Sequence, residues 1–72
     1  MPSQPEKMTL TETMRRHAIG PLRRLLVEEK GGDVFLTGQL TSFYLKQLAQ
    51  EALLPLLAGR RLHNRVEVVA GS

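Results

Sequence analysis

The groups of this chain that could do chemistry are two histidines, seven carboxylates and seven arginines, and their spacing favours binding over catalysis. His17 and His63 each lack a second ligand at metal-binding spacing. Glu28, Glu29 and Asp33 surround a pair of glycines, where acidic side chains more often keep a hairpin soluble than act as an acid pair. Neither a phosphate-binding Gly-x-x-x-x-Gly-Lys loop nor a dinucleotide-binding Gly-x-Gly-x-x-Gly turn is present. We therefore expect no enzyme activity and no bound cofactor or metal.

The arginines give the chain its formal net charge of +3. Six of them form the pairs Arg15-Arg16, Arg23-Arg24 and Arg60-Arg61, and Arg65 stands alone. A guanidinium group is a planar fork that matches carboxylate and phosphate groups. Two interpretations stay open: a solvated basic surface, or an anionic partner such as a lipid headgroup, a nucleic acid or an acidic protein.

Length and composition set the size of the fold. The 72 residues allow one domain, and with only three aromatic residues its core must be built mainly from Leu and Val. Without cysteine there is no disulfide and no thiolate metal site. We expect no signal peptide and no transmembrane segment. The compartment is left open: cytoplasmic for the chain as given, envelope or periplasmic for a piece of a longer exported chain.

Local patterns divide the chain into a lead-in, residues 1–8, and one domain, residues 9–70. The lead-in is rich in proline and polar residues, which predicts disorder. A first helix should start at Thr9 or Thr11, where Thr9 and Glu12 have the spacing of a capping box, and should end at Gly20-Pro21.

Two strands and a tight turn should come next. The apolar run in residues 22–29 predicts the first strand, and the glycine pair predicts a hairpin turn in which both glycines supply positive φ angles. Residues 32–40 alternate as a second strand whose inward side carries Val34, Leu36 and Leu40. Gly38 falls on that side, which indicates a bulge or the close approach of a helix backbone.

A second helix should be capped by Ser42 and interrupted near Leu54 by Pro55, with Gly59 as its terminator. Its predicted inner face contains Leu45, Leu48, Ala49, Ala52 and Leu56. If the helix runs straight, Phe43, Leu54 and Leu57 lie away from the core. Alternatively, Pro55 turns Leu56 and Leu57 inward.

Residues 61–69 form the last predicted strand, with Leu62, Asn64, Val66 and Val68 facing inward. Because an unpaired buried amide is costly, we expect the Asn64 side chain to bond backbone near the helix end or Gly38, the alternative being a ligand contact. On the outward side, His63 can respond to pH if it pairs with Glu67 or is repelled by Arg65.

These elements predict a small α+β domain of order helix, strand, strand, helix, strand, in which two helices cover one face of a three-stranded sheet. The order of the strands in the sheet stays open. The uncovered face should present Arg24, Leu26, Phe35, Thr37, Gln39, His63, Arg65, Glu67 and Val69. Aromatic and arginine side chains together are typical of protein interfaces, and they also suit headgroups or stacked bases.

The pattern resembles the BON domain, a small bacterial module named after osmotic-stress and nodulation proteins. Its glycine turn and apolar-x-apolar-x-Gly-x-apolar strand match Gly32, Val34, Leu36, Gly38 and Leu40. The helix after it matches in Ser42 and Ala49, and the closing apolar-x-Asn-x-apolar-x-apolar strand matches in Leu62, Asn64, Val66 and Val68. The match covers residues 22–69, and it departs from the family where Gly59 is followed by Arg60 instead of a small apolar residue.

The resemblance implies a non-catalytic module that binds phospholipid membranes or mediates contacts within envelope-associated proteins. Three functions are open as hypotheses. The first is attachment to an anionic phospholipid surface through Arg60 and Arg61, and the second is a protein-protein contact or homo-oligomer through the uncovered sheet face. Nucleic-acid binding ranks below both, because no aromatic RNA-binding signature and no Gly-x-x-Gly clamp is present. The candidate binding residues are Arg24, Phe35, His63, Arg65, Arg60 and Arg61, and the structural positions are Gly32, Gly38, Asn64 and Gly59.

Overall fold

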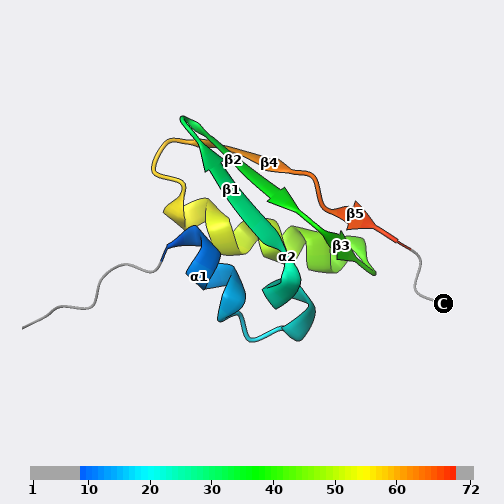
Figure 1. The fold of residues 1–72 in the computed structure, drawn as a ribbon. Helices are drawn as coiled ribbons and strands as arrows, with labels where there is room; N and C mark the ends of the chain where they lie inside the picture. Colours follow the sequence, from blue (N-terminus) through cyan, green and yellow to red (C-terminus); the bar gives the residue numbers. More distant parts are fainter. Residues whose placement is uncertain (1–8, 70–72) are drawn as a thin grey trace, which may run out of the picture.

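A mixed three-stranded sheet with helices packed on one side forms the domain in the computed structural model, which describes residues 9–69 (Figure 1). The predicted lead-in and residue 70 lie outside the described residues. The elements are, in order, α1 (Leu10–Arg15), η1 (Gly20–Arg24), β1 (Leu26–Lys30), β2 (Asp33–Thr37), β3 (Gln39–Leu40), α2 (Phe43–Leu53), η2 (Leu54–Leu56), β4 (Arg61–Asn64) and β5 (Glu67–Val68). The predicted α+β class and element order are confirmed. No helix within residues 9–69 has the length and hydropathy needed to cross a bilayer.

The sheet has the order β1-β2-β4, which the sequence left open. Strands β1 and β2 are antiparallel, and the loop between Lys30 and Asp33 consists of the two glycines, as predicted. Of the two glycines in this loop, only Gly31 has a positive φ, 57°. Some hairpin turns require a positive φ at the first central position alone. The expectation that Gly32 also supplies a positive φ is therefore wrong. Strands β2 and β4 are parallel, so α2 crosses over between them.

Gly38 interrupts the predicted second strand and divides it into β2 and β3. Its φ of 141° is a backbone conformation that other residues rarely adopt. A Cβ atom at this position would come within 2.5 Å of Leu25 Cδ2, so the close neighbour of Gly38 is a side chain. Of the two alternatives for Gly38, a bulge or a nearby helix backbone, the second is therefore wrong. Beyond the break, β3 pairs with β5 in a separate two-stranded parallel ladder.

The first predicted strand begins later than expected. Residues 20–24 form the short 3-10 helix η1, and β1 starts only at Leu26. Pro21 explains the difference, because its fixed φ suits the first turn of a helix and it lacks the N–H that an inner strand position would use. Leu22, which the prediction placed in the strand, lies in η1, and its side chain is buried.

Helix α1 is also shorter than predicted, although its start is confirmed. Thr9 caps it, and Thr9 and Glu12 form the reciprocal bonds of a capping box. The helix ends at Arg15 and not at Gly20-Pro21. Shortly after this end, the backbone N–H of Ile19 donates to Nδ1 of His17, a local bond that replaces a helical one.

Helix α2 has its predicted cap, because Ser42 Oγ accepts a hydrogen bond from the Leu45 N–H. It ends at Leu53, two residues before Pro55, and continues as one turn of 3-10 helix. This turn brings Leu57 into the core, so the alternative in which Pro55 redirects the chain is the one that the structure adopts. Two residues with positive φ, Ala58 and Gly59, then lead into β4.

The core lies between the sheet and the helices. Its buried residues are Leu10, Met14, Leu22, Leu25, Val34, Leu36, Leu40, Ala49, Leu53, Leu57 and Val66. They include the three inward positions that we predicted for the second strand. Figure 1 shows α1 and α2 on the same side of the sheet, which leaves the opposite face without a helical cover.

Candidate binding face

A stacked cluster of three side chains occupies the uncovered face of the sheet. Phe35 and His63 are paired across the parallel strands β2 and β4, so their side chains project from the same face. Their rings stack with centroids 4.7 Å apart and planes 15° from parallel. The guanidinium carbon of Arg65 lies 4.8 Å from the centre of the Phe35 ring. We call Phe35, His63 and Arg65 the ring cluster.

Asp33 holds the imidazole of the ring cluster from the hairpin end of β2. Its Oδ1 accepts a hydrogen bond from Nε2 of His63 at 2.9 Å, and both side chains are partly exposed. The pairing of His63 with Glu67 that we considered from the sequence is therefore wrong. Glu67 lies farther along the chain in β5, where its carboxylate accepts a hydrogen bond from the Gln39 amide.

The chain path between β4 and β5 places Arg65 over the ring. Strand β4 ends at Asn64, and the N–H of Arg65 donates to the carbonyl of Leu36 at 2.8 Å. Arg65 itself is exposed. The backbone of Arg65 is therefore bonded to β2, next to the Phe35 ring that its side chain contacts.

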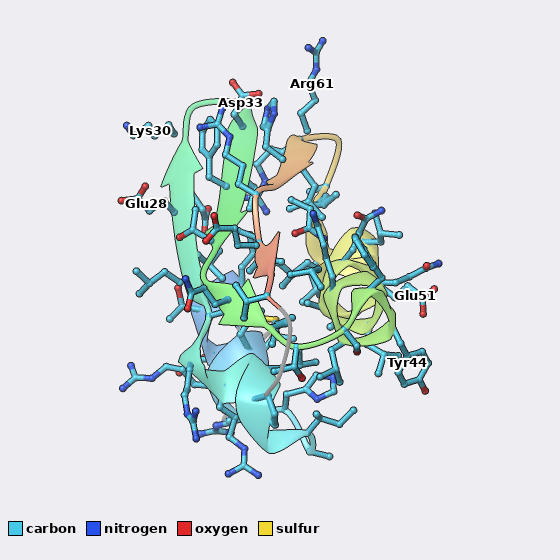
Figure 2. The ribbon with its side chains drawn as sticks, turned by 90° about the vertical axis from the view of Figure 1, so that its right-hand side faces the viewer. Glu28, Lys30, Asp33, Tyr44, Glu51 and Arg61 are labelled. Atoms are coloured by element: carbon cyan, nitrogen blue, oxygen red, sulfur yellow. The ribbon has the colours of Figure 1, made fainter. Side chains whose placement is uncertain are left out.

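Charged and apolar side chains surround the ring cluster. Glu28 is paired with Phe35 in the register of β1 and β2, and it points away from α2 in Figure 2. Lys30 and Arg61 lie at the hairpin end of the sheet, near the labelled Asp33 (Figure 2). Leu26, at the other end of β1, is 67% exposed. The surface combines one aromatic stack with an exposed leucine and charges of both signs.

Two of the predicted site residues lie elsewhere or are already engaged. Arg24 belongs to η1 and not to the sheet, because the 3-10 turn displaces it from the strand. Arg60 donates from Nε to the Leu57 carbonyl and from Nη2 to the Leu56 carbonyl, and it forms an ion pair with Glu29. Arg61, in contrast, extends away from the protein in Figure 2.

Asn64 faces the helix side of the sheet and connects β4 to α2. Its Nδ2 donates to the Lys46 carbonyl at 3.2 Å and to Gln50 Oε1 at 3.3 Å. Its Oδ1 accepts from the N–H of Val66 at 3.2 Å. The bonded carbonyl lies in the middle of α2, whereas we expected the helix end or Gly38.

The face offers an aromatic stack, an exposed leucine and charged side chains. Within residues 9–69, no three histidine or carboxylate side chains gather where a metal ion could be held. Sequence reasoning missed the Glu29–Arg60 and Asp33–His63 pairs, because each joins residues about thirty positions apart. The alternation of strand residues did identify Phe35, His63 and Arg65 as outward-facing.

Comparisons of the chain with models of protein families, with curated proteins and with solved structures found no match.

Proposed function

We propose that this domain is a non-catalytic binding module that associates with protein through the uncovered sheet face, and that a second copy of the chain is its partner. The observation that carries the proposal is the ring cluster, in which an aromatic ring on the outside of the sheet stacks on an imidazole and contacts a guanidinium group. Aromatic and arginine side chains are the groups most enriched at protein interfaces.

The resemblance to the BON domain remains part of this proposal, because the residues that carry it have structural roles here. Val34 and Leu36 are completely buried, and Gly38 has no room for a side chain. Asn64 connects β4 to α2 through its bond to the Lys46 carbonyl. A family of contact-mediating modules therefore fits the sequence and the arrangement of the core, and it implies no catalysis.

The charges around the ring cluster favour a second copy as the partner. The face carries both basic and acidic side chains: Lys30, Arg61, Arg65, Glu28 and Asp33. When two copies of the face meet, the basic groups of one copy can pair with the acidic groups of the other. A strongly charged partner would meet repulsion from one half of these groups. A face of both signs with an aromatic centre is thus suited to self-association.

The size of the face limits the strength of the association. A face that is three strands wide and about five residues long has an area of roughly 240 Å², from the usual rise per residue and the usual distance between strands. Stable complexes bury about 800 Å² per partner, so we expect a dissociation constant in the micromolar range or weaker. Association of this strength becomes useful when several modules are linked or locally concentrated.

Self-association can be tested by measuring light scattering and amide NMR shifts from micromolar to millimolar protein concentration. We expect the mass to rise and the amide signals of Phe35, His63 and Arg65 to shift together. Phe35→Asp should abolish both changes, because it replaces the aromatic ring at the centre of the interface with a carboxylate that must lose its water on association. Tyr44→Asp is the matched control, since Tyr44 is a 70% exposed aromatic residue on α2. A monomer at every concentration would refute the proposal.

Attachment to anionic phospholipid is the second candidate, and the position of two basic residues favours it. Lys30 and Arg61 lie at the same end of the sheet and point outward (Figure 2). Each basic residue near an anionic surface contributes about 1 kcal/mol, so the pair gives only weak adhesion. We expect co-sedimentation with anionic vesicles at low salt that is lost in Lys30→Ser/Arg61→Ser. Equal sedimentation of the wild type and this variant would rule out the hairpin end as the contact.

A further inference from the structure

A hollow of about 320 Å³ lies between α2 and β4, on the helix side of the sheet. It is lined by Phe43, Lys46, Gln47, Gln50 and Asn64. Asn64 and His63 are neighbours in β4, so their side chains project from opposite faces of the strand. The hollow is therefore separate from the ring cluster, and a ligand bound in it would be independent of the proposed function.

The hydrogen bonds around the hollow orient its amide groups. Asn64 Nδ2 donates to Gln50 Oε1, so that bond leaves the Gln50 amide nitrogen to donate elsewhere. Gln47 Nε2 donates to Glu51 Oε2 at 3.4 Å, a bond that leaves the Gln47 carbonyl oxygen to accept. Lys46 adds an ammonium donor. The lining thus offers donors and an acceptor from side chains partly fixed by their neighbours.

Phe43 supplies an apolar surface beside these polar groups. It occupies the first position of α2 and is 74% exposed, so the core does not account for it. An exposed aromatic ring next to several amides can give a ligand one flat apolar contact and several directional hydrogen bonds. Ligand sites commonly have this combination, and the volume of the hollow is at the small end of their range.

We propose that this hollow binds a saccharide. Sugar hydroxyls both donate and accept, which matches amide groups that present both functions. The C–H face of a sugar ring is apolar with slightly positive hydrogens, so it packs against the negative face of an aromatic ring. The lining contains no carboxylate and a single cation, whereas nucleic-acid grooves and headgroup sites need several basic residues. An uncharged, hydroxyl-rich ligand fits this lining best.

The probes for the test are free saccharides added to the complete ¹⁵N-labelled chain: glucose, N-acetylglucosamine and short oligomers of each, up to tens of millimolar. We expect amide shifts confined to residues 43–50 and 64, together with shifts of the Gln47 and Gln50 side-chain NH₂ signals. Phe43→Ala should weaken binding roughly threefold to tenfold, the contribution of one ring contact. Tyr44→Ala, the adjacent exposed residue that does not line the hollow, should leave affinity within about twofold.

Three results would overturn the proposal. The first is the absence of shifts in the hollow with every saccharide. The second is an equal loss of affinity in Phe43→Ala and Tyr44→Ala, which would mean that the ring gives no specific contact. The third is stronger shifts of the same residues by a mononucleotide or inorganic phosphate. Gln47→Ala, at an exposed position, provides a second variant if Phe43→Ala perturbs the fold, and it should also weaken binding.

Discussion

The side chain of Leu25 fills the space in which any side chain at position 38 would have to lie. A Cβ atom on Gly38 would meet Leu25 Cδ2 at 2.5 Å and Leu25 Cα at 3.5 Å. Leu25 is buried, and it sits between η1 and β1. The break between β2 and β3 at Gly38 therefore lies next to Leu25, where the 3-10 helix η1 gives way to β1.

Gly38→Ala should destabilise the domain by roughly 2–4 kcal/mol, because it combines a strained φ with a steric overlap. Urea unfolding followed by circular dichroism gives the change in free energy. Gly32→Ala is the control, since no atom lies within 4 Å of its added Cβ and its φ is not positive. It should change stability by less than about 1 kcal/mol in either direction. Equal effects of the two substitutions would contradict the proposed contact.

Coupling between positions 25 and 38 separates the overlap from the backbone strain. Leu25→Ala alone should cost roughly 2–4 kcal/mol through the cavity that it leaves. In the double variant Leu25→Ala/Gly38→Ala the added methyl group occupies part of that cavity, so the two costs should sum to more than the measured loss. Strict additivity would mean that the whole cost of Gly38→Ala comes from its φ.

Asn64 should protect the Val66 amide from hydrogen exchange. Asn64→Ala removes the Oδ1 acceptor and both donor contacts with α2, so we expect a loss of about 1–2 kcal/mol and faster exchange at Val66. Asn64→Asp keeps an oxygen that can accept from Val66 and loses the bonds to Lys46 and Gln50. Its Val66 amide should stay better protected than in Asn64→Ala. The same exchange rate in both variants would show that Oδ1 is not what protects this amide.

Features that depend on neighbouring residues could be predicted from the sequence. The Thr9–Glu12 capping box, the Ser42 cap and the glycine hairpin each require residues within a few positions of one another. Strand alternation likewise placed Phe35 and His63 on the outside, because residue parity decides the face once a strand is assigned.

Features that depend on distant residues could not be predicted in this way. The hydrogen bond between Asp33 and His63 follows from the register of β2 and β4, which no local pattern specifies. The neighbour of Gly38 depends on how η1 enters β1. The 3-10 turn itself was missed because the strand predicted from the apolar run at residues 25–27 was extended back to Leu22, which belongs to η1.

Leucines on either side of Pro55 should differ in their contribution to stability. Leu57 is 9% exposed and belongs to the core, whereas Leu54 is 48% exposed. We expect Leu57→Ala to cost roughly 2–4 kcal/mol and Leu54→Ala less than about 1 kcal/mol, because only the first leaves a cavity. Urea unfolding of the two variants measures the difference. Similar losses would mean that the helix runs straight past Pro55 in solution.

Arg60 should stabilise the end of η2, whereas its neighbour Arg61 should not. The guanidinium of Arg60 donates to the carbonyls of Leu56 and Leu57 and pairs with Glu29 on β1, so it joins the last helical turn to the sheet. Removing these charge-assisted bonds in Arg60→Ala should cost roughly 1–2 kcal/mol. Arg61→Ala, an exposed position with the same charge, should change stability by less than about 0.5 kcal/mol.

Salt distinguishes the two kinds of bond that Arg60 makes. The pair with Glu29 is partly exposed, so Glu29→Gln should cost less than about 1 kcal/mol, and this loss should shrink in high salt. The bonds to backbone carbonyls are partly buried, so most of the Arg60→Ala loss should persist. Unfolding in urea at low and at high sodium chloride measures both. If high salt removed the whole Arg60→Ala effect, the ion pair and not the carbonyl bonds would account for the stabilisation.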